Sequence, residues 1–389
     1  MAHPDSTKIS DMHAFLAGRQ VEILTAIRRL VEIESPSGDV EGSRAVVDLL
    51  VNIAGEIPAI TSVERITVPG YGEHLKMTAF DRHAGDTPRT LLLGHTDTVH
   101  PRGTLRTQCV RVEEGRLYGP GIFDMKASCV LALEALRALN VLDLSPRHPV
   151  SLLLTCDEES GSKTGRTLVE EEARQAAQVF VLEPPAPGGH VKTARKGVGM
   201  WKVKARGIAS HAGLKPEAGA SAILELARQT ERFHSMSDPQ SGTTFNVGVV
   251  RGGTRSNVVA AEAKIEIDVR LSCMKEAQRI SELMSNLQPF DKRVRLTVTG
   301  NINRAPLERT EGVVKLYLHA REVAACLGFE LGEQAVGGAS DGNFVAALDV
   351  PVLDGLGPDG DGAHAAHEHV LVSDITRRGA LVAGLMATL

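Results

Sequence analysis

The chain contains the run Thr90-Leu91-Leu92-Leu93-Gly94-His95-Thr96-Asp97-Thr98-Val99. Its uninterrupted apolar segment, residues 91–93, is typical of a strand buried on both faces of a parallel sheet. Because ligands of such sheets lie outside the carboxyl ends of the strands, we expect His95 at the rim where chemistry takes place. Asp97 is close enough to accept the second ring N–H of His95 and fix its tautomer, as carboxylates do behind metal-bound imidazoles. A surface His-Thr-Asp turn is the alternative interpretation.

Two further apolar runs stop at acidic residues in the same way. Residues 150–156 lead into Asp157-Glu158-Glu159, and residues 179–182 lead into Glu183. Three strands that end in polar residues are the layout expected at an α/β active-site rim. Helical periodicity over residues 11–34 adds one amphipathic helix to flank the sheet. The sequence therefore predicts an α/β fold with a mostly parallel central sheet flanked by helices.

After about residue 195 the pattern changes to strict alternation. Residues 201–205 and 263–269 alternate apolar and charged side chains. This period of two marks an antiparallel sheet with one face in water. We therefore predict a smaller α+β domain with an antiparallel sheet at residues 196–304, inserted into a discontinuous catalytic domain of residues 1–195 and 305–389.

Composition excludes several classes of protein. At 389 residues the chain is long enough for two domains, and its net charge of -5 gives no nucleic-acid footprint. No apolar stretch approaches the roughly 18 residues that a membrane span needs, and the N-terminus does not resemble a signal peptide. The five scattered cysteines include no CxxC pair, which favours free thiols in the cytoplasm and argues against a sulfur-ligated metal.

The expected rim gathers one histidine and four carboxylates, from His95, Asp124, Glu158, Glu159 and Glu183. Carboxylates crowded together repel one another unless they are protonated or neutralised by cations. A pair of divalent metal ions resolves this conflict, since one carboxylate can bridge both ions. Imidazole and carboxylate ligands without thiolate suit zinc, with cobalt or manganese as substitutes. Two such ions polarise a carbonyl and activate a shared water, and a remaining carboxylate can act as general base.

Three motifs together resemble the co-catalytic zinc metallopeptidase family. They are Gly-His-Thr-Asp-Thr-Val at 94–99, Tyr-Gly-Pro-Gly-Ile-Phe-Asp-Met-Lys at 118–126 and Asp-Glu-Glu-Ser-Gly-Ser at 157–162. They occur in the order found in that family, and the similarity extends from about residue 20 to residue 388. The family includes glutamate carboxypeptidases, acetylornithine deacetylase, succinyl-diaminopimelate desuccinylase and aminoacylase.

The resemblance implies a role for each matching residue and two Zn²⁺ ions per subunit. Glu158 would be the general base, Asp97 would orient His95, and the peptide after Asp124 would be cis. The metal ligands would be His95, Asp124 and Glu183 for one zinc, and Asp124 as a bridge, Glu159 and His364 for the other.

One segment departs from the family pattern, and another offers more than one candidate ligand. Relatives usually have Gly-Gly where this chain has Ala127-Ser128, and we expect little consequence. The last ligand lies within His-Ala-Ala-His-Glu-His at 364–369. His364 fits best by its distance to Glu368, with His367 as the next candidate and a surface histidine cluster as the alternative.

The inserted segment carries a fourth motif, Ser210-His211-Ala212-Gly213. In relatives this domain forms a homodimer, and the resemblance implies that His211 reaches the active site of the partner subunit and stabilises the oxyanion. Asn257 and Arg270 are candidates for binding the substrate carboxylate, with Arg304 as a weaker one. The alternatives are an exposed loop histidine for His211 and an ordinary polar-face residue for Arg270.

The segment Gly337-Gly338-Ala339-Ser340-Asp341-Gly342-Asn343-Phe344 resembles the glutamate-carboxypeptidase-like branch. Backbone amides of such a turn, with Gly338 and Ser340 as candidates, could bind a carboxylate. The branch implies hydrolysis of an N-acyl amino acid or peptide that releases a C-terminal amino acid, often glutamate. An N-acyl-amino-acid deacylase would use the same machinery.

Two other classes of function compete with this interpretation. Residues 338–342 satisfy G-x-S-x-G, so Ser340 could be the nucleophile of a serine hydrolase, with Asp354 or Asp361 and then His364 or His367. However, residues 333–336 are a poor buried strand, and this mechanism leaves the acidic residues 157–159 unexplained. A catalytically inactive binding protein would predict a lost ligand or base, and none is lost.

Overall fold

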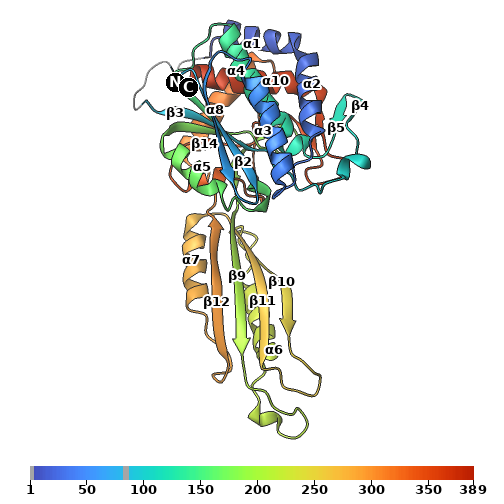
Figure 1. The fold of residues 1–389 in the computed structure, drawn as a ribbon. Helices are drawn as coiled ribbons and strands as arrows, with labels where there is room; N and C mark the ends of the chain where they lie inside the picture. Colours follow the sequence, from blue (N-terminus) through green and yellow to red (C-terminus); the bar gives the residue numbers. More distant parts are fainter. Residues whose placement is uncertain (1–3, 82–86) are drawn as a thin grey trace. The chain divides into compact units, whose positions relative to one another are not determined.

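The computed structural model describes residues 4–81 and 87–389 and divides them into two compact units (Figure 1). Unit 1 comprises the described residues of Met1–Thr193 together with Arg309–Ala335 and Ser340–Leu389, and unit 2 comprises Ala194–Glu308 and Val336–Ala339. Compared with the predicted insertion at 196–304, unit 2 is longer by a few residues at each end and also includes residues 336–339, part of the Gly-rich turn.

Unit 1 is built on a six-stranded mixed sheet with the strand order β1-β2-β6-β3-β7-β14. The strands β6, β3, β7 and β14 are parallel, whereas β2 and β1 add an antiparallel edge. The predicted fold class is therefore confirmed. The strands span Ile60–Val68 (β1), Gly72–Ala79 (β2), Arg89–His95 (β3), Val150–Thr155 (β6), Ala176–Val181 (β7) and Val352–Leu353 (β14).

The apolar run that opens the sequence is buried on both sides. Leu91, Leu92 and Leu93 are all fully buried, and Leu92 belongs to the large cluster that also contains helix α4. Burying one such leucine stabilises the fold by about 1.5–3 kcal/mol. This packing fixes β3 between β6 and β7, and so fixes where its last residue, His95, emerges.

Helices cover the sheet of unit 1. Among them α4 packs on β3 and is buried along most of its length. The single helix predicted over residues 11–34 is wrong, because α1 ends at Gly18 and Arg19 leaves the helical conformation (φ -107°, ψ 12°) before α2 begins. The helices span Ser6–Gly18 (α1), Gln20–Val31 (α2), Val40–Ala54 (α3), Ala127–Val141 (α4), Gly165–Arg174 (α5), Glu311–Cys326 (α8), Gly342–Ala346 (α9) and Val372–Thr388 (α10).

A small four-stranded sheet, β15-β16-β5-β4, joins two distant parts of the sequence. In its centre β16 pairs with β5, with His369 opposite Tyr118. It therefore brings the segment around His364 beside the segment that leads to Asp124. The Asp124–Met125 peptide is cis, as expected. The strands span Arg111–Glu113 (β4), Arg116–Tyr118 (β5), Gly360–Asp361 (β15) and His369–Leu371 (β16).

Unit 2 contains an antiparallel sheet of order β10-β11-β9-β12. The apolar side chains of the alternating strands, such as Trp201 and Val203, form a separate core with α6 and α7. The elements span Gly197–Arg206 (β9), Ala222–Ser235 (α6), Thr244–Gly252 (β10), Glu262–Leu271 (β11), Met274–Ser285 (α7) and Arg295–Arg304 (β12). A short pair of strands, Val191–Arg195 (β8) and Glu333–Val336 (β13), spans the points where the chain passes between the two units. No helix among the described residues has the length and apolar character needed to cross a membrane.

Candidate active site

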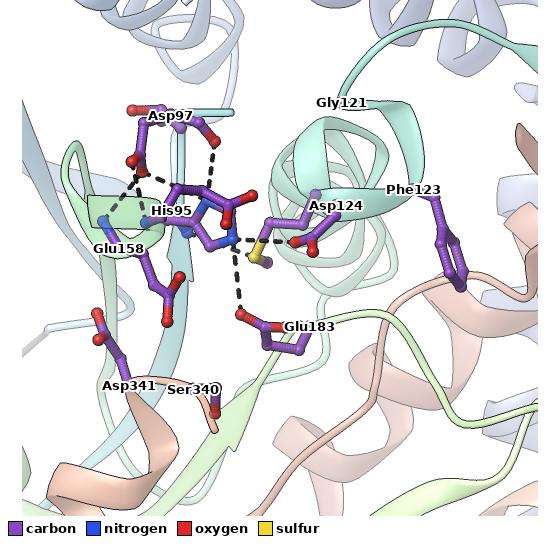
Figure 2. Close-up of polar contacts among 12 residues, drawn as sticks. His95, Asp97, Gly121, Phe123, Asp124, Glu158, Glu183, Ser340 and Asp341 are labelled. Atoms are coloured by element: carbon purple, nitrogen blue, oxygen red, sulfur yellow. Dashed lines mark hydrogen bonds and ion pairs between the residues drawn. The ribbon is translucent and has the colours of Figure 1, made fainter. Parts of the chain in front are cut away.

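Three parallel strands of unit 1 deliver polar side chains to one edge of the sheet. His95 is the last residue of β3, Glu158 and Glu159 lie in the turn after β6, and Glu183 follows β7. Figure 2 shows the side chains of His95, Glu158 and Glu183 converging on one region. The sequence pattern placed them together because the carboxyl ends of parallel strands meet at one edge.

Asp97 connects two of these strand ends. It is buried, and its carboxylate accepts the backbone N–H groups of Glu158 and Glu159, each at 3.1 Å, through different oxygens. The ring of His95 donates from Nδ1 to the backbone carbonyl of Asp97 at 3.0 Å, and Asp97 Oδ1 lies 3.4 Å from the same nitrogen. With Nδ1 used in this way, Nε2 of His95 points toward the acidic cluster (Figure 2).

Asp124 presents its two oxygens to two different histidines. Its Oδ1 lies 3.1 Å from His95 Nε2, and its Oδ2 lies 3.3 Å from His364 Nε2. Each histidine has a second carboxylate partner: Glu183 Oε1 is 3.5 Å from His95 Nε2, and Glu159 Oε1 is 3.2 Å from His364 Nε2. Asp124 thus sits between two histidine–carboxylate pairs.

The histidines and carboxylates of this cluster perturb one another. Burial disfavours charge on His95, yet the surrounding carboxylates, Asp124 foremost, raise its pKa well above the ordinary value. Hydrogen bonds to Asp124 and Glu159 raise the pKa of His364 to about 10. Burial raises the pKa of Glu159, while the two histidines overcome burial and lower the pKa of Asp124. A cluster with this excess of carboxylates draws positive charge to its centre.

The donor set fits divalent metal ions. Ligand atoms of His95, Asp124 and Glu159 lie within 4.8 Å of one another, and so do those of His95, Glu158 and Glu183. Oε1 of Glu159 is buried and finds no hydrogen bond of ordinary geometry among the described residues, although His364 lies nearby. One imidazole nitrogen with several carboxylate oxygens is a donor set that zinc and similar ions accept.

Asp157, the first acidic residue of the Asp-Glu-Glu run, has a different role. Asp157 is fully buried, and its carboxylate accepts Thr164 N (2.7 Å), Thr164 Oγ1 (2.8 Å) and Gly165 N (3.2 Å). It therefore closes the turn that carries the two glutamates and is not available to a ligand. The sequence left its role unassigned, and its position at the end of the buried strand was the available signal.

Comparison with known proteins gives the family. The model of the family described as "Peptidase family M20/M25/M40" matches residues 91–388. The chain belongs to this family. Members of this family are metal-dependent hydrolases, and the chain is therefore an enzyme of the metallopeptidase and amidohydrolase class.

Relatives within the family differ in their named activities. The chain is 28% identical over 380 residues to carboxypeptidase G2 of Pseudomonas sp. (strain RS-16), which covers 95% of this chain and 90% of that protein. It is 30% identical over 304 residues to a succinyl-diaminopimelate desuccinylase of Verminephrobacter eiseniae (strain EF01-2), covering 72% of this chain and 74% of that protein.

Solved structures share the fold at low sequence identity. Aminopeptidase PepT from Bacillus cereus ATCC 10987 superposes with a TM-score of 0.79 at 22% identity, covering 95% of this chain and 98% of that chain. The YXEP protein of Bacillus subtilis, described as a dinuclear metal binding peptidase from the M20 family, gives 0.69 at 14% identity, covering 96% and 100%.

Three other candidates from the family motifs, His211, Asn257 and Arg270, belong to unit 2. His211 is exposed, and its Nδ1 accepts the N–H of Gly213 at 3.2 Å. Asn257 is exposed, and its backbone carbonyl accepts the N–H of Ala212, which joins it to the His211 loop. Arg270 is paired through two hydrogen bonds with Asp268.

Of the remaining candidates, Arg304 and the exposed Gly338 lie in unit 2, and Ser340 lies in unit 1 with its hydroxyl engaged. Arg304 is buried at the end of β12, and the carbonyl of Gly338 accepts a hydrogen bond from Arg195 at 3.3 Å. Ser340, in unit 1, is fully buried, and its hydroxyl donates to Asp354 at 2.7 Å. The serine-hydrolase alternative pairs Ser340 with a histidine as base, whereas this hydroxyl donates to a carboxylate.

Proposed function

We propose that this enzyme hydrolyses an amide bond and releases a C-terminal amino acid, glutamate first among the candidates, from an N-acyl or peptide donor. The observation that carries the proposal is the position of Asp124, whose two oxygens face two separate histidine–carboxylate pairs. Such an arrangement suits two metal ions that share one carboxylate. The choice of a carboxypeptidase is supported by the similarity to carboxypeptidase G2 over 95% of the chain.

In this proposal the cluster holds two zinc ions, with cobalt or manganese as substitutes. When bound, the ions polarise the scissile carbonyl and lower the pKa of the attacking water. His95, Asp124 and Glu183 would hold one ion, and Asp124, Glu159 and His364 would hold the other.

Glu158 is the proposed general base. Its backbone N–H is fixed by Asp97, and its carboxylate belongs to the group formed with His95 and Glu183. Glu158 therefore takes a proton from the attacking water and later delivers it to the nitrogen of the leaving amine. Asp97 holds the imidazole of His95 through Nδ1, so that Nε2 stays available to the cluster.

Unit 2, as the inserted domain of residues 196–304, is proposed to form a homodimer. Strand β10 is an edge strand with no second neighbour among the described residues, and the adjacent helix α6 begins with exposed Ile223 (45%) and Leu224 (53%). Val250 on β10 is 62% exposed. Edge strands flanked by exposed apolar side chains favour pairing with a second copy. In the dimer His211 would stabilise the oxyanion in the partner's active site.

Asn257 and Arg270 are proposed to bind the carboxylate of the substrate. Two of the five N–H donors of Arg270 bind Asp268. These two hydrogen bonds fix the guanidinium and leave three donors for a ligand. Arg304, Gly338 and Ser340 remain secondary candidates for the same task. The five cysteines are free, which supports a cytoplasmic location.

An N-acyl-amino-acid deacylase is the second candidate function, favoured by the 30% identity to a desuccinylase. A panel of N-acyl-glutamate, dipeptide, N-acetyl-ornithine and succinyl-diaminopimelate separates the two. Amine release from each is measured on chelator-stripped enzyme and again after zinc is added. Activity that returns with zinc and favours the glutamate donors supports the carboxypeptidase, whereas preference for an acyl-diamine supports the deacylase.

The same panel tests the mechanism. Glu158→Gln is expected to abolish turnover while two metal ions stay bound, because only the proton carrier is lost. Activity that withstands chelation and is lost to a serine-reactive probe would overturn the proposal in favour of Ser340. Near-normal turnover of Glu158→Gln would remove Glu158 from the role of base.

A further inference from the structure

One buried carboxylate beside the cluster accepts four hydrogen bonds and has no part in the mechanism above. Glu368 is 2% exposed. Its Oε1 accepts the backbone N–H groups of Phe123 (2.9 Å) and Asp124 (3.0 Å). Its Oε2 accepts the N–H of Gly121 (2.8 Å) and Nε2 of His100 (2.6 Å).

These four donors lie on two segments that are far from Glu368 in the sequence. Three of them belong to the loop between β5 and α4, and one of the three is the amide of Asp124 itself. The fourth, His100, lies five residues beyond His95 in the segment that follows β3. Glu368 therefore ties the Asp124 loop to the chain that carries His95.

Glu368 also anchors its own segment, which holds His364. The backbone carbonyl of Glu368 accepts the N–H of Gly119 at 3.2 Å, where β16 begins to pair with β5. The amide of Glu368 bonds back to Ala365 at 3.2 Å, within the turn that His364 enters with a φ of +64°. A left-handed conformation at histidine is uncommon and needs surrounding contacts to hold it.

We propose that Glu368 is a positioning residue that sets the distance between Asp124 and His364, and so the geometry of the second metal site. This assignment rests on the proposed function, in which Asp124 and His364 are ligands. Hydrogen bonds from several N–H donors to a buried carboxylate are short and directional, so they fix the loop rather than merely fill space. Outer residues of this kind typically change metal affinity about 10–100-fold when they are altered.

Glutamine is an informative replacement because it keeps the shape of Glu368. One oxygen of the amide can still accept from Phe123 and Asp124. The NH₂ group then faces His100, whose ring can change tautomer and accept, but it also faces the N–H of Gly121, which loses its acceptor. Glu368→Gln should therefore retain the fold and loosen the Asp124 loop, whereas Glu368→Ala removes all four acceptors at once.

A matched control exists in unit 2. Glu225 is also 2% exposed, and its carboxylate accepts the backbone N–H groups of Phe290 and Asp291, each at 3.0 Å, and the side chain of Gln229 at 2.9 Å. Glu225→Gln removes the charge from a similar buried carboxylate that holds a backbone turn. It should lower stability to a similar degree and leave metal binding unchanged.

The experiment measures zinc affinity by competition with a chromophoric chelator, on metal-free wild type, Glu368→Gln and Glu225→Gln. Thermal unfolding of each metal-free protein is recorded alongside. We expect Glu368→Gln to weaken binding of the second zinc about 10–100-fold, with a smaller effect on the first. In the cobalt-loaded form its visible absorption spectrum should change, which a general loss of stability would not cause.

Each outcome decides one question. A wild type that binds no zinc overturns the proposed function, and this assignment falls with it. A wild type with two zinc ions, together with a Glu368→Gln variant within twofold of its affinity and with an unchanged cobalt spectrum, overturns the assignment alone. Should Glu368→Gln fail to fold, Glu368→Asp keeps the charge and withdraws the carboxylate from the three amides, and an unchanged cobalt spectrum in that variant counts against the assignment.

Discussion

Replacing Asp97 by asparagine tests whether one buried carboxylate organises both the imidazole and the acidic turn. In the wild type, Oδ1 accepts the amide of Glu158, while Oδ2 accepts the amide of Glu159 and the hydroxyl of Ser37. Asparagine keeps the size and offers only one acceptor oxygen. Whichever way the new amide turns, one of the two backbone N–H groups faces an NH₂ group.

The contacts of Asp97 set the size of the effect. Its hydrogen bonds involve a charged acceptor, and each such bond contributes about 1.5–3 kcal/mol to stability. One of the two amide bonds is lost and the other becomes a weaker neutral bond, so the free energy of unfolding should fall by about 2–4 kcal/mol. The hydroxyl of Ser37 can rotate to accept from an NH₂ group and adds little to this loss.

Catalysis should suffer along with stability, since the same two amides fix the backbone of Glu158 and Glu159. Loss of an outer contact to a metal ligand typically lowers affinity or activity about 10–100-fold. We expect Asp97→Asn to lower kcat/KM on the best donor of the panel by that factor. Zinc affinity should fall with it.

Urea unfolding followed by far-ultraviolet circular dichroism measures the stability change. The chain has one tryptophan, Trp201, and it lies in unit 2, so its fluorescence reports on the unit that the mutation does not touch. Ser37→Ala is the matched control, because it removes the hydroxyl and leaves both amide bonds in place. Equal effects of Ser37→Ala and Asp97→Asn, or wild-type zinc affinity in Asp97→Asn, would refute the role given to Asp97.

Three further predictions follow from local geometry. A Cβ at Gly94 would lie 2.6 Å from Cε of buried Met125, so Gly94→Ala should lower the free energy of unfolding by about 1–3 kcal/mol through overpacking and should also lower activity. A Cβ at Gly18 would meet nothing within 4 Å, so Gly18→Ala should leave both stability and activity unchanged. Hydrogen bonds from Arg279 and Thr243 lower the pKa of Glu276 to about 2, so the stabilisation from its charge is present above pH 4.5 and is lost as the pH falls through about 2. The difference in unfolding free energy between wild type and Glu276→Gln, measured by Trp201 fluorescence, should therefore shrink between pH 4.5 and about 2. Metal removal by a chelator should lower the unfolding temperature, since zinc at 1,000 times its Kd stabilises the folded state by about 4 kcal/mol, and an unchanged temperature would contradict tight binding.

Much of the site could be predicted because it follows from periodic patterns. Buried parallel strands end at one edge of a sheet, so an apolar run that stops at His95, or just before Glu183, places its polar residue without any knowledge of the loops. The family motifs gave Asp124 its expected role as the bridging ligand, which the pattern of strand ends does not assign. They also favoured His364 over His367, and His364 is the one that contacts Asp124 and Glu159.

Other features depend on contacts that a sequence pattern does not encode. The helix predicted over 11–34 is interrupted at Arg19, whose guanidinium bonds to Glu134 at 2.9 Å, 115 residues away. Helical periodicity continues across this break because both helices bury an apolar face. The contact of Ser37 with Asp97 and that of His100 with Glu368 likewise join loops whose paths are set by the sheet.

Three consecutive acidic residues have different roles that the sequence pattern does not distinguish. Asp157, Glu158 and Glu159 are consecutive, and composition alone treats them as equal carboxylates. Asp157 follows the buried strand directly, and its carboxylate accepts a hydrogen bond from a backbone N–H group. Asp97 accepts the N–H groups of Glu158 and Glu159, and this contact fixes the backbone from which their side chains face the cluster. The carboxylate of Asp157 is therefore used to shape the turn, although the sequence places it beside two proposed catalytic glutamates. Glu368, with three amide donors, likewise supports the site through the backbone.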